Sequence, residues 1–138
     1  MIYISPFDGV VSSLHTLCDS ERACVVVSNK GMDAIRHSLE AHELSDIIRF
    51  VVGDQLDVPK KPNPEILHKY VIPQFDRVDQ NRILMVGDTE TDIQFAMNAK
   101  IASCWVRYGY GHADKCSALA PNYRIDRFSE LLEIVGAA

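Results

Sequence analysis

Short runs of apolar, β-branched residues alternate with helical patterns along this 138-residue chain. Runs with few polar side chains are typical of strands covered on both faces, as in parallel sheets. The runs are Ala23 to Val27, Ile48 to Val52, Ile83 to Val86 and Ser103 to Val106. Apolar residues at three- and four-residue spacing predict helices between them. Their markers are Ile35, Leu39 and His42, then Ile66, Leu67 and Tyr70, then Ile93, Ala96 and Met97. This order predicts an α/β fold of three layers, with a doubly wound, mostly parallel sheet and a closing helix from Phe128 to Val135.

Length and composition indicate one domain over residues 1–138, with 47% hydrophobic and 24% charged residues. A net charge of −5 without a block of basic residues argues against nucleic acid and against an anionic membrane as partners. No secretory signal or membrane span is visible, so a cytoplasmic location is expected. The four cysteines are scattered without a CxxC pair, which favours reduced thiols over disulfides or a zinc site. The expected partner is a small molecule.

In a fold of this class, ligands bind beyond the carboxyl ends of the strands, so the residues after each run matter most. The first run is followed by Ser28-Asn29-Lys30-Gly31. If a helix starts here, the Ser28 hydroxyl and free backbone N–H groups would form an anion site. A simpler interpretation is that Ser28 only caps the helix.

The second run leads into Lys60-Lys61-Pro62-Asn63-Pro64-Glu65. Asn63 can cap a helix that has Pro64 at its first position. The prolines would fix the direction of Lys61, whose ammonium group could neutralise phosphate charge. The alternative is an ordinary solvated lysine.

The third run ends in Gly87-Asp88-Thr89-Glu90-Thr91-Asp92. Asp88 lies at the strand exit and Asp92 one helical turn later, so both carboxylates can face one point. Such oxygen ligands suit Mg²⁺, which keeps several waters and binds substrate phosphate. Acidic residues in a first helical turn also stabilise the helix dipole, and that role alone is the alternative.

The segments VVVSNK, KKPNPE and VGDTETDI resemble the second, third and fourth motifs of the haloacid dehalogenase superfamily, in its phosphoglycolate-phosphatase-like branch. The resemblance covers essentially the whole chain. It implies that Ser28, Asn29 and Lys61 bind the phosphoryl group, with Lys61 also stabilising it during catalysis. It also implies that Asp88 ligates Mg²⁺ with support from Asp92. The implied reaction is dephosphorylation of a small phosphorylated metabolite through a covalent aspartyl-phosphate.

The family's first motif carries the nucleophilic aspartate, and Pro6-Phe7-Asp8-Gly9-Val10 imitates that motif with proline in the nucleophile's place. The interval of 19 positions from Gly9 to Ser28 instead matches the helix that follows the family's cap domain. Val10, Leu14 and Leu17 would form the apolar face of that helix, with Asp8 as its N-cap. On this interpretation the first motif and the cap domain are missing. The chain would then be a partial core that is inactive alone. The alternative is a non-catalytic phosphate- or metal-binding or protein-interaction module.

By the same resemblance, the missing central strand would lie between the runs ending at Val27 and Val86. Those runs would either pair directly or leave a gap whose unpaired backbone groups are costly when buried. We expect the gap to be filled by Ile2 to Ile4, by a second copy of the chain, or by an N-terminal segment of a longer protein. Lys100 stands where the family usually ends a helix with glycine, which predicts local strain or a different cap.

Overall fold

The computed structural model describes residues 15–17, 22–108 and 111–135. The predicted strand from Ile2 to Ile4 and the predicted helix cap Asp8 lie outside these residues. Residues 15–17 are helical. The Leu17 side chain is buried, as the predicted helix requires at its end.

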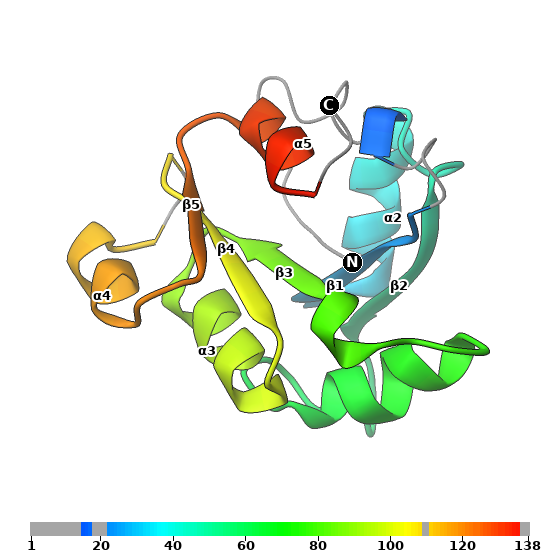
Figure 1. The fold of residues 1–138 in the computed structure, drawn as a ribbon. Coiled ribbons are helices and arrows are strands. Elements are labelled where there is room, and N and C mark those ends of the chain that lie inside the picture. Colours follow the sequence, from blue (N-terminus) through cyan, green and yellow to red (C-terminus); the bar gives the residue numbers. More distant parts are fainter. Residues whose placement is uncertain (1–14, 18–21, 109–110, 136–138) are drawn as a thin grey trace.

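Five strands form two parallel sheets (Figure 1). They are β1 (Cys24–Gly31), β2 (Ile48–Asp54), β3 (Leu84–Gly87), β4 (Ala102–Val106) and β5 (Tyr123–Ile125). The α/β class and the four predicted strands are confirmed, and every strand pair is parallel. The sequence did not predict β5, because it has three residues and two of them, Tyr123 and Arg124, are exposed.

The predicted helices are present with altered ends. They are α2 (Met32–Ala41), the π-helix η1 (Ile66–Val71), α3 (Glu90–Ala99) and, in the closing region, the 3-10 turn η4 (Phe128–Glu130) followed by α5 (Leu131–Ile134). The sequence did not predict α4 (Ala113–Ala118) or the 3-10 turns η2 (Ile72–Gln74) and η3 (Gln80–Arg82). The wide turn of η1 precedes Pro73, which has no N–H and crowds the carbonyl four residues earlier. Met97, predicted on a packed face, is 54% exposed. Its side chain therefore lies outside the core.

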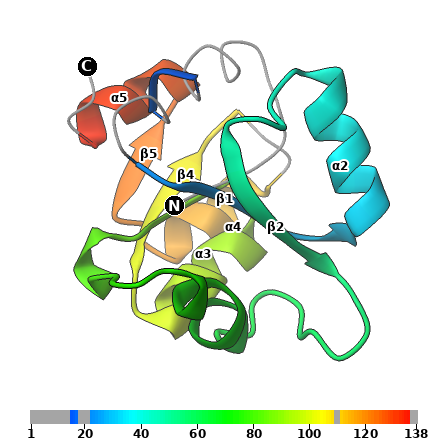
Figure 2. The same ribbon diagram turned by 90° about the vertical axis from the view of Figure 1, so that its right-hand side faces the viewer.

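The expected single sheet is split, with β1–β2 in one part and β3–β4–β5 in the other. For the missing central strand, we predicted either direct pairing of β1 with β3 or a gap between them. Among the described strands β1 and β3 do not pair, which agrees with a gap. Figure 2 shows β2 with α2 and β4 with β5 on opposite sides of the molecule. Two apolar layers nevertheless span both sheets. One contains side chains from η1 and α3, and the other contains side chains from the α5 region together with Leu17 and Leu44.

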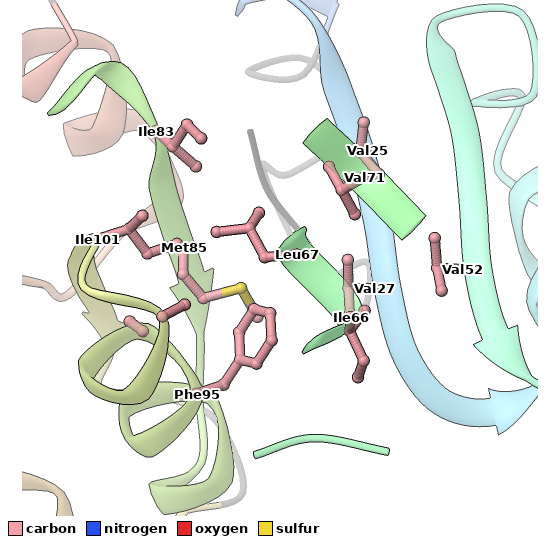
Figure 3. Close-up of a cluster of buried hydrophobic side chains, with 12 residues drawn as sticks. Val25, Val27, Val52, Ile66, Leu67, Val71, Ile83, Met85, Phe95 and Ile101 are labelled. Carbon is pink, nitrogen blue, oxygen red and sulfur yellow. The ribbon is translucent and has the colours of Figure 1, made fainter. Parts of the chain in front are cut away.

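The first of these layers joins the two sheets directly (Figure 3). Val25 and Val27 of β1 and Met85 of β3 belong to the same buried cluster, and Leu67 of η1 lies between them. Leu67 is fully buried. The π-helix thus packs across the two half-sheets.

Helix α3 ends at Lys100, which has φ 60° and ψ 44°, the left-handed conformation expected there of glycine. The prediction was local strain or a different cap, and this left-handed conformation in a residue with a Cβ is the strained outcome. Gln80 Nε2 donates hydrogen bonds to the carbonyl oxygens of Ala99 at 2.6 Å and Lys100 at 3.3 Å. A side chain from η3 therefore satisfies carbonyl groups that the helix end leaves without partners.

Within the described residues, no helix is long and apolar enough to cross a membrane.

Candidate functional site

The tip of β1 carries Ser28 and Asn29, and both lie on the strand rather than at a helix start. Helix α2 begins only at Met32, with Gly31 as its N-cap. The prediction that Ser28 lies at the start of a helix is therefore wrong, and so is the interpretation that Ser28 caps that helix. The strand continues three residues past Ser28 because its pairing with β2 resumes at Gly31 and Asp54. Ser28 Oγ instead accepts a hydrogen bond from the Lys30 N–H at 3.1 Å.

Asn29 connects the tip of β1 to the segment that carries Lys61. Its Oδ1 accepts from the Lys61 N–H at 2.9 Å, and its Nδ2 donates to the Lys61 carbonyl at 3.2 Å. This two-way bond fixes the Lys61 backbone beside Asn29. The phosphate-binding residues predicted from two separate segments are therefore neighbours.

The Lys61 side chain points inward and is only 10% exposed. Its Nζ lies 2.5 Å from Asp92 Oδ1, so the alternative of a solvated lysine is wrong. The predicted cap at Asn63 is present, since Asn63 Oδ1 accepts from the Glu65 N–H at 2.9 Å. Asn98 of α3, which the sequence did not single out, donates to the Pro62 carbonyl at 3.0 Å and holds the same segment.

The Asp92 carboxyl group accepts several hydrogen bonds from the residues that follow β3. Its Oδ2 accepts from the Asp88 N–H at 3.1 Å, the Thr89 N–H at 3.2 Å and the Thr89 hydroxyl at 3.0 Å. Thr89 caps α3 in return through a capping box. A Cβ on Gly87 would collide with the Asp92 carboxyl group, so this arrangement depends on glycine before Asp88. Both Asp92 oxygens are engaged, which makes Asp92 a positioning residue for Lys61 and for the Asp88 backbone.

Asp88 is 8% exposed and lies just past the end of β3. The segment after β4 closes over it, because the Gly111 N–H donates to the Asp88 carbonyl at 3.0 Å. A side chain at Gly111 would collide with that carbonyl. Glu90 Oε1 accepts from the His112 N–H at 2.7 Å, which lowers the pKa of Glu90. Sequence reasoning missed Glu90, because these contacts depend on a segment more than twenty residues away.

The surroundings of Asp88 are acidic and partly dry. Burial, and then the Asp88 carboxylate, raise the pKa of Tyr108 to about 12. Burial also raises the pKa of the Cys116 thiol to about 11, together with its hydrogen bond to Glu90. Both groups therefore keep their protons at neutral pH, and neither adds negative charge beside Asp88.

The residues present fit part of a Mg²⁺ site. Over the described ranges, no three His, Cys, Asp or Glu side chains are grouped so as to hold a metal ion. Mg²⁺ commonly uses one or two protein carboxylates, with waters and phosphate as its other ligands. Asp88 can supply one carboxylate, whereas Asp92 is already bonded to Lys61 and Thr89. The assignment of Asp88 as ligand and Asp92 as support stays a prediction.

A profile for haloacid dehalogenase-like hydrolases matches residues 2–106. A phosphoglycolate phosphatase of Vibrio parahaemolyticus is 34% identical over 132 residues, which are 96% of this chain and 57% of that protein. The pyrimidine 5'-nucleotidase YjjG of Escherichia coli is 29% identical over 133 residues, covering 95% of this chain and 57% of that protein. The chain thus spans less than three fifths of the length of these relatives.

Solved structures agree with this relationship. A predicted phosphoglycolate phosphatase from Haemophilus somnus superposes with a TM-score of 0.85 and 26% identity, over 93% of this chain and 56% of that one. The HAD-hydrolase YfnB of Bacillus subtilis, solved bound to magnesium, has the same fold with a TM-score of 0.79 and 20% identity, over 94% of this chain and 55% of that one. The family match covers most of the chain, and the relatives agree with the predicted phosphoglycolate-phosphatase-like branch. The chain belongs to the haloacid dehalogenase-like hydrolase family.

Proposed function

We propose that this chain is the core of a Mg²⁺-dependent phosphatase that acts on a small phosphate ester through an aspartyl-phosphate. One observation carries the proposal: hydrogen bonds run from Asn29 through Lys61 to Asp92 and on to the Asp88 backbone. They bring the three motif-bearing segments together at the carboxyl ends of β1 and β3, where α/β folds bind ligands. The proposal includes a cytoplasmic location.

Each residue of this group has a proposed task. Ser28 and Asn29 bind phosphate oxygens from the tip of β1. Lys61 presents a positive charge that stabilises the transferring phosphoryl group, and Asp92 holds Lys61 in place. Asp88 ligates Mg²⁺, which when bound neutralises phosphate charge.

The attacking aspartate is proposed to lie outside this chain. After β1 the first carboxylate is Asp33, which is exposed in the first turn of α2, and Asp54 at the end of β2 is exposed and 3.8 Å from Lys60. Asp88 is assigned to the metal. The chain alone is therefore expected to bind phosphate and Mg²⁺ without appreciable turnover.

Binding and turnover are tested separately. Mn²⁺ titration, followed by electron paramagnetic resonance, should show one site that Asp88→Asn removes and that Asp54→Asn, the exposed control, leaves intact. Inorganic phosphate binding should weaken in Lys61→Met. Unchanged Mn²⁺ binding in Asp88→Asn would overturn the metal assignment.

Turnover is measured on a panel of small phosphate esters that includes phosphoglycolate and pyrimidine 5'-nucleotides, for which relatives are named. We expect none from the chain alone. Turnover that Asp88→Ala abolishes would show that this chain contains its own nucleophile, contrary to the proposal.

A non-catalytic interaction module is the second candidate, and it is favoured by the lack of pairing between β1 and β3 among the described strands. Absence of both phosphate and Mn²⁺ binding in a folded chain would favour this candidate over the phosphatase core.

A further inference from the structure

The carboxyl group of Glu90 holds the segment that leads into α4. Glu90 is the first residue of α3, and it is half-buried. Its Oε1 accepts a hydrogen bond from the His112 N–H at 2.7 Å and another from the Cys116 thiol at 3.5 Å. His112 and Cys116 are the two ends of the first turn of α4, because the Cys116 N–H donates to the His112 carbonyl at 2.9 Å. One carboxylate oxygen therefore fastens both ends of this turn to α3.

The residue before this turn, Gly111, lies directly against Asp88. The Gly111 N–H donates to the Asp88 carbonyl at 3.0 Å. A Cβ at Gly111 would collide with that carbonyl and would lie 2.9 Å from Cys116 Sγ. Gly111 thus fits closely between Asp88 and a residue that Glu90 holds, and His112, which Glu90 also holds, is its neighbour in the chain.

Asp88 is in this way held at both of its backbone polar groups. Its N–H donates to Asp92 Oδ2 at 3.1 Å, and its carbonyl accepts from Gly111. Fixing the backbone limits the directions in which the Asp88 carboxylate can point. Asp92 makes the first bond itself, whereas Glu90 supports the second through the segment that it holds.

We propose that Glu90 is a positioning residue for the metal site, which orients Asp88 toward Mg²⁺ by holding Gly111 and His112 in place. The inference rests on the proposed function, in which Asp88 ligates Mg²⁺. Residues that orient a metal ligand without touching the ion typically change metal affinity by about ten- to a hundredfold when they are replaced.

A simpler role for Glu90 is stabilisation of α3. A carboxylate in the first helical turn interacts favourably with the helix dipole. That role needs the negative charge of Glu90, whereas the positioning role needs an acceptor oxygen at the same place. The two bonds to α4 favour the positioning role, because the dipole interaction does not require them. Glutamine separates the two roles, since it keeps an acceptor oxygen and removes the charge.

Helix α4 has a second attachment that does not depend on Glu90. The Cys116 side chain is fully buried in a cluster with Ile93 and Trp105. Glu90→Ala should therefore loosen the backbone of residues 111 and 112 without detaching α4. The variant is expected to fold, and a circular dichroism melt checks this.

The first measurement uses the full chain and Mn²⁺, followed by electron paramagnetic resonance. Glu90→Ala should weaken Mn²⁺ binding by about tenfold, whereas the affinity of Glu90→Gln should stay closer to that of the original chain. Asp114→Ala is the matched control, because it removes an exposed carboxylate from the first turn of α4 and should leave the affinity unchanged.

A second variant reaches the same hydrogen bond without touching Glu90. In Gly111→Ala the new methyl group would collide with the Asp88 carbonyl. It should therefore weaken Mn²⁺ binding as Glu90→Ala does. A folded Gly111→Ala variant with unchanged affinity would contradict the proposed orientation of Asp88 through Gly111.

The second measurement needs no metal. Nuclear magnetic resonance can detect a scalar coupling across the hydrogen bond between the Gly111 nitrogen and the Asp88 carbonyl carbon. We expect this coupling in the original chain, in Glu90→Gln and in Asp114→Ala, and we expect its loss in Glu90→Ala. Stabilisation of the α3 dipole alone would not produce this pattern.

Three outcomes would overturn the inference. A coupling that persists in Glu90→Ala would show that Gly111 is held without Glu90. Unchanged Mn²⁺ affinity in Glu90→Ala, while Asp88→Asn removes the site, would show that Asp88 needs no support from Glu90. Equal losses of affinity in the alanine and glutamine variants would show that the charge acts and not the hydrogen bonds.

Failure of the proposed function has a different signature. In that case Asp88→Asn leaves Mn²⁺ binding intact, although Glu90→Ala still abolishes the coupling between Gly111 and Asp88. That result would overturn the assignment of Asp88 to the metal, and with it the role of Glu90 toward the ion, while the structural link between Glu90 and Asp88 would stand.

Discussion

Lys61 Nζ and Asp92 Oδ1 lie 2.5 Å apart, with only 10% and 7% of their side chains exposed. This buried ion pair ties the segment after β2 to the first turn of α3. Removing one partner leaves the other charge buried without compensation. Such changes typically destabilise a protein far more than the loss of an exposed pair.

Lys61→Met should therefore lower the free energy of unfolding by about 3 kcal/mol, measured by urea denaturation. Lys69→Met is the matched control. Lys69 lies 3.4 Å from Glu65 in an exposed i,i+4 pair, and its loss should cost less than about 0.5 kcal/mol. Equal effects of the two substitutions would contradict the role given to Lys61.

Gly87→Ala should move Asp92, because the new methyl group would collide with the Asp92 carboxyl group. We expect a loss of about 2 kcal/mol in stability, typical of overpacking. The amide resonances of Asp88 and Thr89 should shift as their bonds to Asp92 Oδ2 lengthen.

Gly31→Ala is the control for this change, since no atom lies within 4 Å of a Cβ at Gly31. Its effect should be smaller and should leave the Asp88 and Thr89 resonances in place. Unshifted resonances in Gly87→Ala would show that Asp92 tolerates the methyl group.

Lys100→Gly should stabilise the protein by about 1 kcal/mol, because a left-handed conformation is unfavourable for a residue with a Cβ. Lys100→Ala keeps the Cβ and should give no such gain. Chemical denaturation of both variants measures the difference. A gain in the alanine variant would point to the lysine charge instead of the backbone.

The buried thiols predict a loss of stability at alkaline pH. Burial, and then Glu130, raise the pKa of Cys104 to about 12, and the pKa of Cys116 is raised to about 11, from an ordinary value of 9.0. Above pH 9 the unfolded chain loses these protons first, so the folded state binds more protons. The stability from these groups is complete below pH 9 and declines as pH rises towards 11 and 12.

Urea denaturation at several pH values between 8 and about 10.5 in reducing buffer measures this effect. Replacing Cys104 and Cys116 with alanine should make the decline shallower, whatever the overall stability of the variant. Identical slopes for the variant and the original chain would show that other groups cause it.

The sequence predicted those elements that can be recognised from neighbouring residues alone. Continuous apolar runs located four strands, and one unusual residue, Lys100, marked the end of α3 and its local strain. The sequence could not predict that the Lys61 side chain is buried, because its burial depends on an ion pair with Asp92, 31 positions later. Helical spacing placed Asp92 near Asp88 but did not show which donors its carboxyl group would accept. The helix start expected after Val27 was wrong because β1 continues to Gly31.

The split between β1 and β3 also bears on how the two half-sheets are held together. Side-chain bonds of Asn29, Lys61 and Asp92 fasten the half-sheets at their carboxyl ends, while a cavity separates their amino ends. At the carboxyl ends, separation of the halves would break these polar bonds, and at the amino ends it would expose the apolar side chains that the two half-sheets share. The residues proposed for chemistry therefore lie where directional bonds set the spacing of the two half-sheets.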